Sequence, residues 1–100
     1  MSSWDSIIRS AIANKRVLEF TYHGHHRVVE PHVYGRKNGV DQLLGYQIGG
    51  TSKSGGVPDW RRFDLPDVNG ATATPSGFPG PRPYPSGKHT EWDTTYAIVK

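Results

Sequence analysis

The sequence contains no cysteine, only one methionine and no long hydrophobic run. The lack of cysteine excludes disulfide bonds, thiolate zinc sites, iron–sulfur clusters and cysteine nucleophiles, and it suits a reducing cytoplasm. No apolar stretch approaches the roughly 20 residues that a membrane-spanning helix needs. The amino terminus carries Asp5 and Arg9 where a signal peptide would be apolar. We therefore predict a cytoplasmic protein that makes no use of a membrane.

What the sequence does contain indicates one small folded domain. It has 100 residues, a formal net charge of +3, 34% hydrophobic residues, 12 glycines and 8 prolines. This length is sufficient for one hydrophobic core but too short for two independent ones. The aromatic residues argue against disorder, and the glycines and prolines indicate many turns.

One amphipathic helix is predicted over residues 3–14. Its apolar residues recur at helical spacing and form a single stripe: Trp4, Ile7, Ile8, Ala11 and Ile12. A helix of this length is marginal in isolation, so we expect it to pack against a sheet.

Five short antiparallel strands are predicted after the helix, over residues 17–22, 25–34, 40–48, 59–65 and 71–74. His23-Gly24 and Asn38-Gly39 are typical of two-residue hairpin turns. The first turn would place Tyr22 opposite His25 and Phe20 opposite Arg27. The fold class is thus mainly β, with the helix packed on a small barrel that closes its own edges.

The composition changes after residue 74. Residues 75–87 are rich in proline and glycine, which interrupt regular ladders, and Trp92, Tyr96, Ile98 and Val99 form a last apolar segment. We divide the chain into a helix and barrel at residues 1–74 and an irregular extension at residues 75–100. The extension would belong to the same domain and could supply a closing strand.

Several segments within residues 7–68 follow the order of a known family. The first two are Ile7-Ile8-Arg9-Ser10-Ala11-Ile12 and Val17-Leu18-Glu19-Phe20-Thr21-Tyr22. They are followed by Arg27-Val28-Val29-Glu30-Pro31, Val40-Asp41-Gln42-Leu43-Leu44-Gly45-Tyr46 and Trp60-Arg61-Arg62-Phe63-Asp64-Leu65. These segments resemble the WYL domain, a bacterial module found mostly behind winged-helix regulators, and the first two are similar to its helix and first strand. The resemblance implies an SH3-like or Sm-like barrel and a ligand-sensing role in bacterial transcription regulation or defence.

The chain departs from the family at positions that bear on function. Asp41-Gln42 stand where the family has the Trp-Tyr of its name, and Asp64 stands where an arginine is expected. Basic residues at such positions contribute to the proposed ligand channel of the family. Their replacement here weakens the inference that this chain binds an anion at that same site.

The sequence contains five histidines, a residue type that often binds metal ions. His25 and His26 are adjacent, so in a strand they point to opposite faces and cannot both reach one ion. Glu30 and His32 form a candidate acid/base pair, but a pair spaced by two residues is more typical of a structural contact at a bend. No nucleophile elbow or phosphate loop is present. We predict no enzymatic activity, no catalytic residue, no metal and no cofactor.

Basic and aromatic residues on the strands form the predicted ligand site, because cations hold phosphates while aromatic faces stack on bases. The site residues are Tyr22, Arg27, Tyr46, Arg61 and Arg62, with the glycine-rich loop 49–58 closing over them. The predicted ligand is a nucleotide or a single-stranded nucleic acid. The alternative is a protein-interaction module that uses an edge strand and the proline-rich tail to bind a partner regulator or a second copy.

Overall fold

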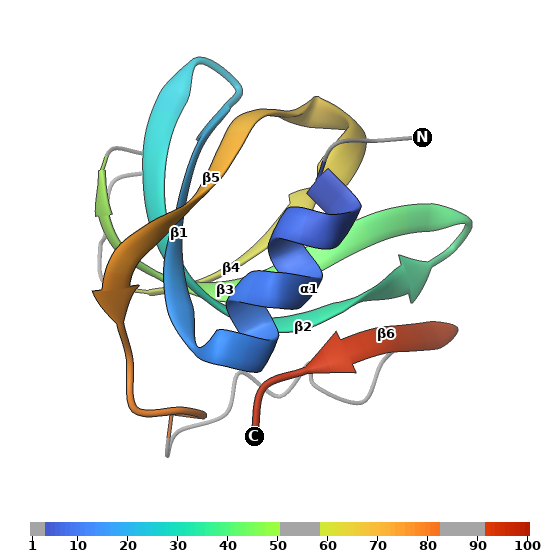
Figure 1. Cartoon of the computed structure of the whole chain (residues 1–100). Helices are drawn as coiled ribbons and strands as arrows, with labels where there is room; N and C mark the ends of the chain where they lie inside the picture. Colours follow the sequence, from blue (N-terminus) through green and yellow to red (C-terminus); the bar gives the residue numbers. More distant parts are fainter. Residues whose placement is uncertain (1–3, 51–58, 83–91) are drawn as a thin grey trace.

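The computed structural model describes residues 4–50, 59–82 and 92–100, and these form a mainly β fold with one amino-terminal helix. The elements are α1 (Trp4–Asn14), β1 (Arg16–Tyr22), β2 (His25–Lys37), β3 (Val40–Gly50), β4 (Asp59–Asp64), the 3-10 turn η1 (Leu65–Asp67), β5 (Val68–Gly77) and β6 (Thr94–Ile98). The strands pair antiparallel in one sheet of six strands, which curves around the core (Figure 1).

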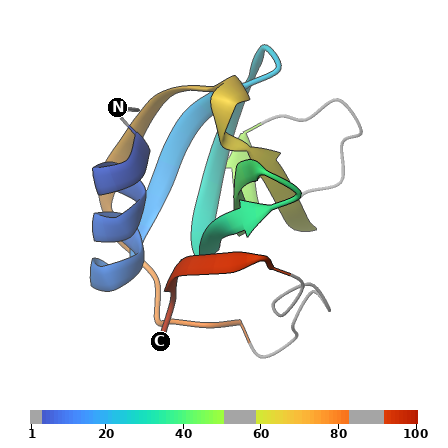
Figure 2. The same ribbon diagram turned by 90° about the vertical axis from the view of Figure 1, so that its right-hand side faces the viewer.

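Helix α1 confirms the predicted stripe. Ile8, Ala11 and Ile12 are buried, and the helix lies across the curved sheet beside β1 and β5 (Figures 1 and 2). The Tyr34 hydroxyl of β2 donates a hydrogen bond of 2.6 Å to the Asp5 carboxylate and ties the first turn of the helix to the sheet. Within the described ranges, no helix has the length and apolar character needed to cross a membrane.

Both predicted hairpin turns are confirmed. His23 and Gly24 have φ angles of 50° and 79°, and Asn38 and Gly39 have 52° and 78°. Two successive residues with positive φ are what a type I′ turn requires, and asparagine and glycine adopt that conformation at low cost. The first turn sets the predicted register, with Tyr22 opposite His25 and Phe20 opposite Arg27.

Strand β2 is long and has different neighbours along one of its edges. Its first part, up to Val29, pairs with β1, while its last part, from Val33 to Arg36, pairs with β6. The ladder with β3 shifts register between Pro31 and Val33. Proline lacks the amide hydrogen that a regular ladder needs, so the strand bends where the sequence predicted an interruption.

The strand count and the closure differ from the prediction. The sheet has six strands, not five, because the apolar segment near the carboxyl end forms β6 and adds to β2. The ladder order is β4-β3-β2-β1-β5, and among the described residues no ladder joins β4 to β5, so the sheet is open there. Strand β5 is also longer than the predicted 71–74 and continues through Pro75 to Gly77.

The core lies between α1 and the inner face of the sheet. Its buried members on the strands include Leu18, Phe20, Val29, Leu43 and Phe63. Phe78 and Val99, from the extension after residue 74, are buried in the same cluster. Their backbone amides donate hydrogen bonds to Lys15 and His32, at 3.0 and 2.9 Å, so the extension is joined to the first part of the chain.

Candidate functional site

The structure divides the predicted ligand-site residues between the two faces of the sheet. In the β3–β4 ladder Gly45 opposes Arg61, while Tyr46 opposes Trp60 and Leu44 opposes Arg62. Side chains alternate along a strand, so Arg61 lies on the inner face with Phe63, and Tyr46 and Arg62 lie on the outer face. Arg61 and Arg62 are therefore not brought together.

Arg27 is the centre of the group on the inner face. Its guanidinium lies 5.4 Å from the Tyr22 ring centre and 5.8 Å from the Phe63 ring centre. It donates hydrogen bonds of 3.2 Å to the Gln47 side-chain oxygen and 3.3 Å to the Tyr22 carbonyl oxygen. The residue is only 5% exposed.

No acidic side chain among the described residues pairs with Arg27, and its Nε has no hydrogen-bond partner there. Burial lowers the pKa of Arg27, and the positive charge of Arg61 lowers it further. Burying a charge without an opposite charge is costly, since water no longer solvates it. Arg27 and Arg61 therefore place two positive charges close together on the inner face.

Tyr22 forms the aromatic part of this inner site. Its ring stacks on His23 at a centroid distance of 4.0 Å and meets the Phe63 ring edge-on at 5.1 Å. Its hydroxyl oxygen accepts a hydrogen bond of 3.1 Å from the Asp64 amide. Burial raises the pKa of the Tyr22 hydroxyl, so this group stays neutral and serves as a positioned polar contact.

Gln47 belongs to the inner site, although the sequence reasoning did not include it. Its side-chain nitrogen donates a hydrogen bond of 3.0 Å to the Gly49 carbonyl, which turns its oxygen toward Arg27. The signal that could have identified it is strand alternation, which places Gln47 on the same face of β3 as the apolar Leu43, where a polar residue is unusual. Gln47 is fully buried.

The outer face carries a second polar cluster, formed by Glu30, His32, Tyr46, Trp60 and Arg82. The Arg82 guanidinium binds both Glu30 carboxylate oxygens, each at 2.8 Å, and lies 4.4 Å from the Tyr46 ring centre. This paired geometry is strong and specific. Tyr46 also meets Trp60 edge-on at 5.3 Å, so the half-buried Tyr46 ring contacts both Arg82 and Trp60 on the outer face.

His32 is fully buried and uses both ring nitrogens. Its Nδ1 lies 2.8 Å from the Glu30 carbonyl oxygen and its Nε2 lies 3.2 Å from the Arg82 amide nitrogen. Since a carbonyl only accepts and an amide N–H only donates, the ring is a neutral tautomer with its proton on Nδ1. Glu30 and His32 therefore hold the outer cluster together through Arg82.

Two other histidines, His23 and His26, take separate acidic partners. His23 lies 3.3 Å from Asp67 and His26 lies 3.1 Å from Glu19. Within residues 4–50, 59–82 and 92–100, no three histidine or acidic side chains are grouped as metal ligands. Residues 51–58 of the predicted loop over the site lie outside the described residues, while Gly49 and Gly50 continue β3.

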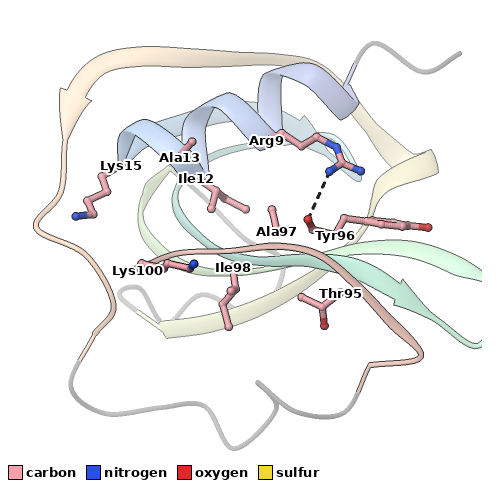
Figure 3. A pocket seen from close by; sticks show the side chains of 9 residues that line it. All are labelled: Arg9, Ile12, Ala13, Lys15, Thr95, Tyr96, Ala97, Ile98 and Lys100. Atoms are coloured by element: carbon pink, nitrogen blue, oxygen red, sulfur yellow. Dashed lines mark hydrogen bonds between the residues drawn. The ribbon is translucent and has the colours of Figure 1, made fainter.

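A pocket lies elsewhere on the molecule, between α1 and β6 (Figure 3). Its volume is about 500 Å³, and it is lined by Arg9, Ile12, Ala13, Lys15, Thr95, Tyr96, Ala97, Ile98 and Lys100. None of the predicted ligand-site residues lines this pocket. Sequence reasoning missed it because it forms between the first and last elements of the chain.

Comparison with known proteins adds no family assignment. No family model matches the chain, and no curated protein or solved structure shows significant similarity to it.

Proposed function

We propose that this protein is a non-enzymatic module that binds an anionic, nucleotide-like ligand on the inner face of its sheet. The observation that carries the proposal is Arg27, a buried guanidinium beside Arg61 that no acidic side chain of the described residues balances. Phosphate oxygens would accept from the two guanidinium groups, and a base would stack near the Tyr22–His23 pair. The proposed site is thus narrowed to Tyr22, Arg27 and Arg61, with Gln47 added.

We also propose that the fold is a divergent WYL-like barrel of the SH3-like or Sm-like type, opened between β4 and β5. The support is the order of elements, a helix followed by strongly bent antiparallel strands, together with the quoted sequence resemblance. On this proposal the module works in the bacterial cytoplasm as an accessory sensor for transcription regulation or defence.

The adjacent arginines of β4 provide a matched test. A fluorescein-labelled single-stranded DNA oligonucleotide and a labelled ATP analogue are titrated with the protein at 50 and 200 mM salt. We expect Arg61→Gln and Arg27→Met to weaken binding by at least tenfold, and Arg62→Gln, on the opposite face, to leave it within about threefold. Absence of binding at the lower salt, or equal losses in the Arg61→Gln and Arg62→Gln variants, would contradict the proposal.

Protein–protein interaction is the second candidate function. Strand β6 pairs with β2 only, so its other edge is unpaired within the described part of the chain. Such an edge is a template for another strand. Self-association through it would appear as a concentration-dependent dimer in sedimentation velocity, whereas a monomer at all concentrations would contradict self-association.

A further inference from the structure

The unpaired edge of β6 faces helix α1. The amide of Val99 donates a hydrogen bond of 2.9 Å to the His32 carbonyl of β2, so the neighbouring Ile98 turns its backbone groups away from β2. The ladder shifts register at Tyr96, where the direction is given by a side-chain contact. The Tyr96 carbonyl confirms this direction, because it accepts a hydrogen bond from Arg9 of α1 (Figure 3). At 3.4 Å that bond is long and weak.

Apolar side chains line the groove along this edge. Ile12 and Ala13 of α1 and Ala97 and Ile98 of β6 line the groove. Ile98 is 43% exposed and is one of the two large exposed hydrophobic residues of the described chain. The groove therefore offers both backbone groups and apolar surface to an occupant.

The charged side chains that line the groove all have the same sign. Arg9, Lys15 and Lys100 line it, and no acidic residue does. Arg9 is already paired with Asp5 at 3.1 Å, whereas no ion pair is found for Lys15 or Lys100 among the described residues. The groove thus favours an anionic occupant.

We propose that the groove between α1 and β6 binds an extended acidic peptide of a partner protein, which adds as a strand to β6. The peptide backbone would pair with Tyr96 and Ile98 and displace the Arg9 side chain from the Tyr96 carbonyl. Its apolar side chains would lie on Ile12 and Ile98, and its carboxylates would reach Lys15, Lys100 and the released Arg9. This inference rests on protein–protein interaction, the second proposed function, and it names an acidic peptide as the partner.

Charge decides between a peptide and a second copy of this chain. An edge-to-edge pair of β6 strands would bring the cations of two grooves close together, which is repulsive. An acidic peptide neutralises them. A small amphipathic anion would use the charges but not the backbone edge, so the test must separate these two contributions.

Peptide chemistry makes that separation. The probe is a fluorescein-labelled peptide of sequence Glu-Val-Glu-Val-Glu-Val, and its binding is measured by fluorescence anisotropy. Two further versions of this peptide carry N-methyl groups, one on the odd-numbered amides and one on the even-numbered amides. We expect one of the two to bind at least tenfold more weakly, because its methyl groups replace the amide hydrogens that pair with β6. A Lys-Val peptide of the same length should show no binding.

Protein variants locate the binding. Lys15→Glu should weaken peptide binding at least tenfold, while Lys37→Glu, in the β2–β3 hairpin and outside the groove lining, should change it by less than about threefold. Ile98→Pro removes the outward amide of the edge strand, and an unchanged circular dichroism spectrum shows that the variant folds. If Ile98→Pro does not fold, the N-methylated peptides on the natural protein decide.

Equal binding of both N-methylated peptides, equal effects of Lys15→Glu and Lys37→Glu, or no binding of the acidic peptide would overturn the proposal. Dimer formation without peptide binding would leave the interaction function standing but overturn this occupant of the groove.

Discussion

Arg27 is a single residue that carries a buried positive charge on the inner face of the sheet. Its stem and guanidinium contact Tyr22 and Phe63, but the charge is balanced by no acid among the described residues. Replacing a buried ion by an apolar side chain of similar volume is often neutral or stabilising. A residue kept for ligand binding should therefore be dispensable for folding.

We expect Arg27→Met to keep the free energy of unfolding within about 1 kcal/mol of the natural protein, because relief of the buried charge offsets the lost bond to Gln47. Leu18→Ala, at a fully buried core position, should cost about 2–5 kcal/mol. Urea denaturation measures both. A loss for Arg27→Met as large as that for Leu18→Ala would identify Arg27 as a structural residue.

The site was only partly predictable from single residues. Alternation along a strand already implies that Arg61 and Arg62 face opposite ways, and the predicted site combined them in spite of it. The pairing of Glu30 with Arg82 had no local signal, because the residues are far apart in sequence and only the folded chain brings them to 2.8 Å. The composition indicated that basic and aromatic residues could bind a ligand, but not on which face of the sheet each of them lies.

At the scale of elements, Asp5 and Tyr34 join α1 to β2. The hydrogen bond from Tyr34, together with the bond and charge of Arg9, holds the pKa of Asp5 below its usual value. Burial, followed by the bond to Asp5, raises the pKa of Tyr34. Because the pKa of Asp5 is lower in the folded state, its contribution to stability is present above the unfolded value near 3.9 and is lost as the pH falls through the folded value.

Tyr34→Phe should raise the pKa of Asp5 toward its ordinary value, as measured by NMR titration of the side-chain carboxyl. The variant should also lose less stability than the natural protein between pH 5 and pH 2, since less of its stability depends on ionised Asp5. An unchanged Asp5 pKa would show that Arg9 alone sets it.

The junction of β2 and β6 depends on Gly35. A Cβ atom there would overlap the Thr94 carbonyl oxygen and lie 2.9 Å from the Trp92 ring. We expect Gly35→Ala to cost about 2 kcal/mol or more and to detach β6. At Gly39 a Cβ atom would meet open space, and only the positive φ of that position is unfavourable for alanine. Gly39→Ala should therefore lower the free energy of unfolding by roughly 1–2 kcal/mol. Hydrogen exchange of the β6 amides separates the two, with faster exchange expected in Gly35→Ala alone.

Elements with local causes were predicted well, and those with distant partners were not. The α1 stripe and both type I′ turns depend on residues adjacent in sequence, and the structure confirms them. The addition of β6 to β2 joins Val33 to Ile98, a pairing that no local pattern specifies. The open β4–β5 side likewise depends on how far the whole sheet curves.

At the scale of the whole molecule, the two ends of the chain share one core. Phe78 and Val99 are buried with the α1 and β1 residues, and Arg82 neutralises buried Glu30. Residues 1–74 alone would expose that apolar surface and would remove the charged partner of the Glu30 carboxylate.

A chain ended after Thr74 should therefore lack a cooperative thermal transition, as followed by circular dichroism, while the full chain unfolds in one step. As a control, a chain that ends after residue 74 and also carries Glu30→Gln tests whether the unpaired charge is the main defect. A cooperative transition of the truncated chain, with dispersed amide resonances, would show that residues 1–74 form a domain without the extension.

The division of the β2 edge between β1 and β6 sets an order of events during synthesis. The strands β1, β2 and β3 can pair as soon as they leave the ribosome, since their turns are short, but β6 is made much later. Until then the stretch of β2 from Val33 to Arg36 presents unpaired backbone groups on that side. The nascent chain must therefore protect this stretch from other chains, and aggregation during expression should begin there.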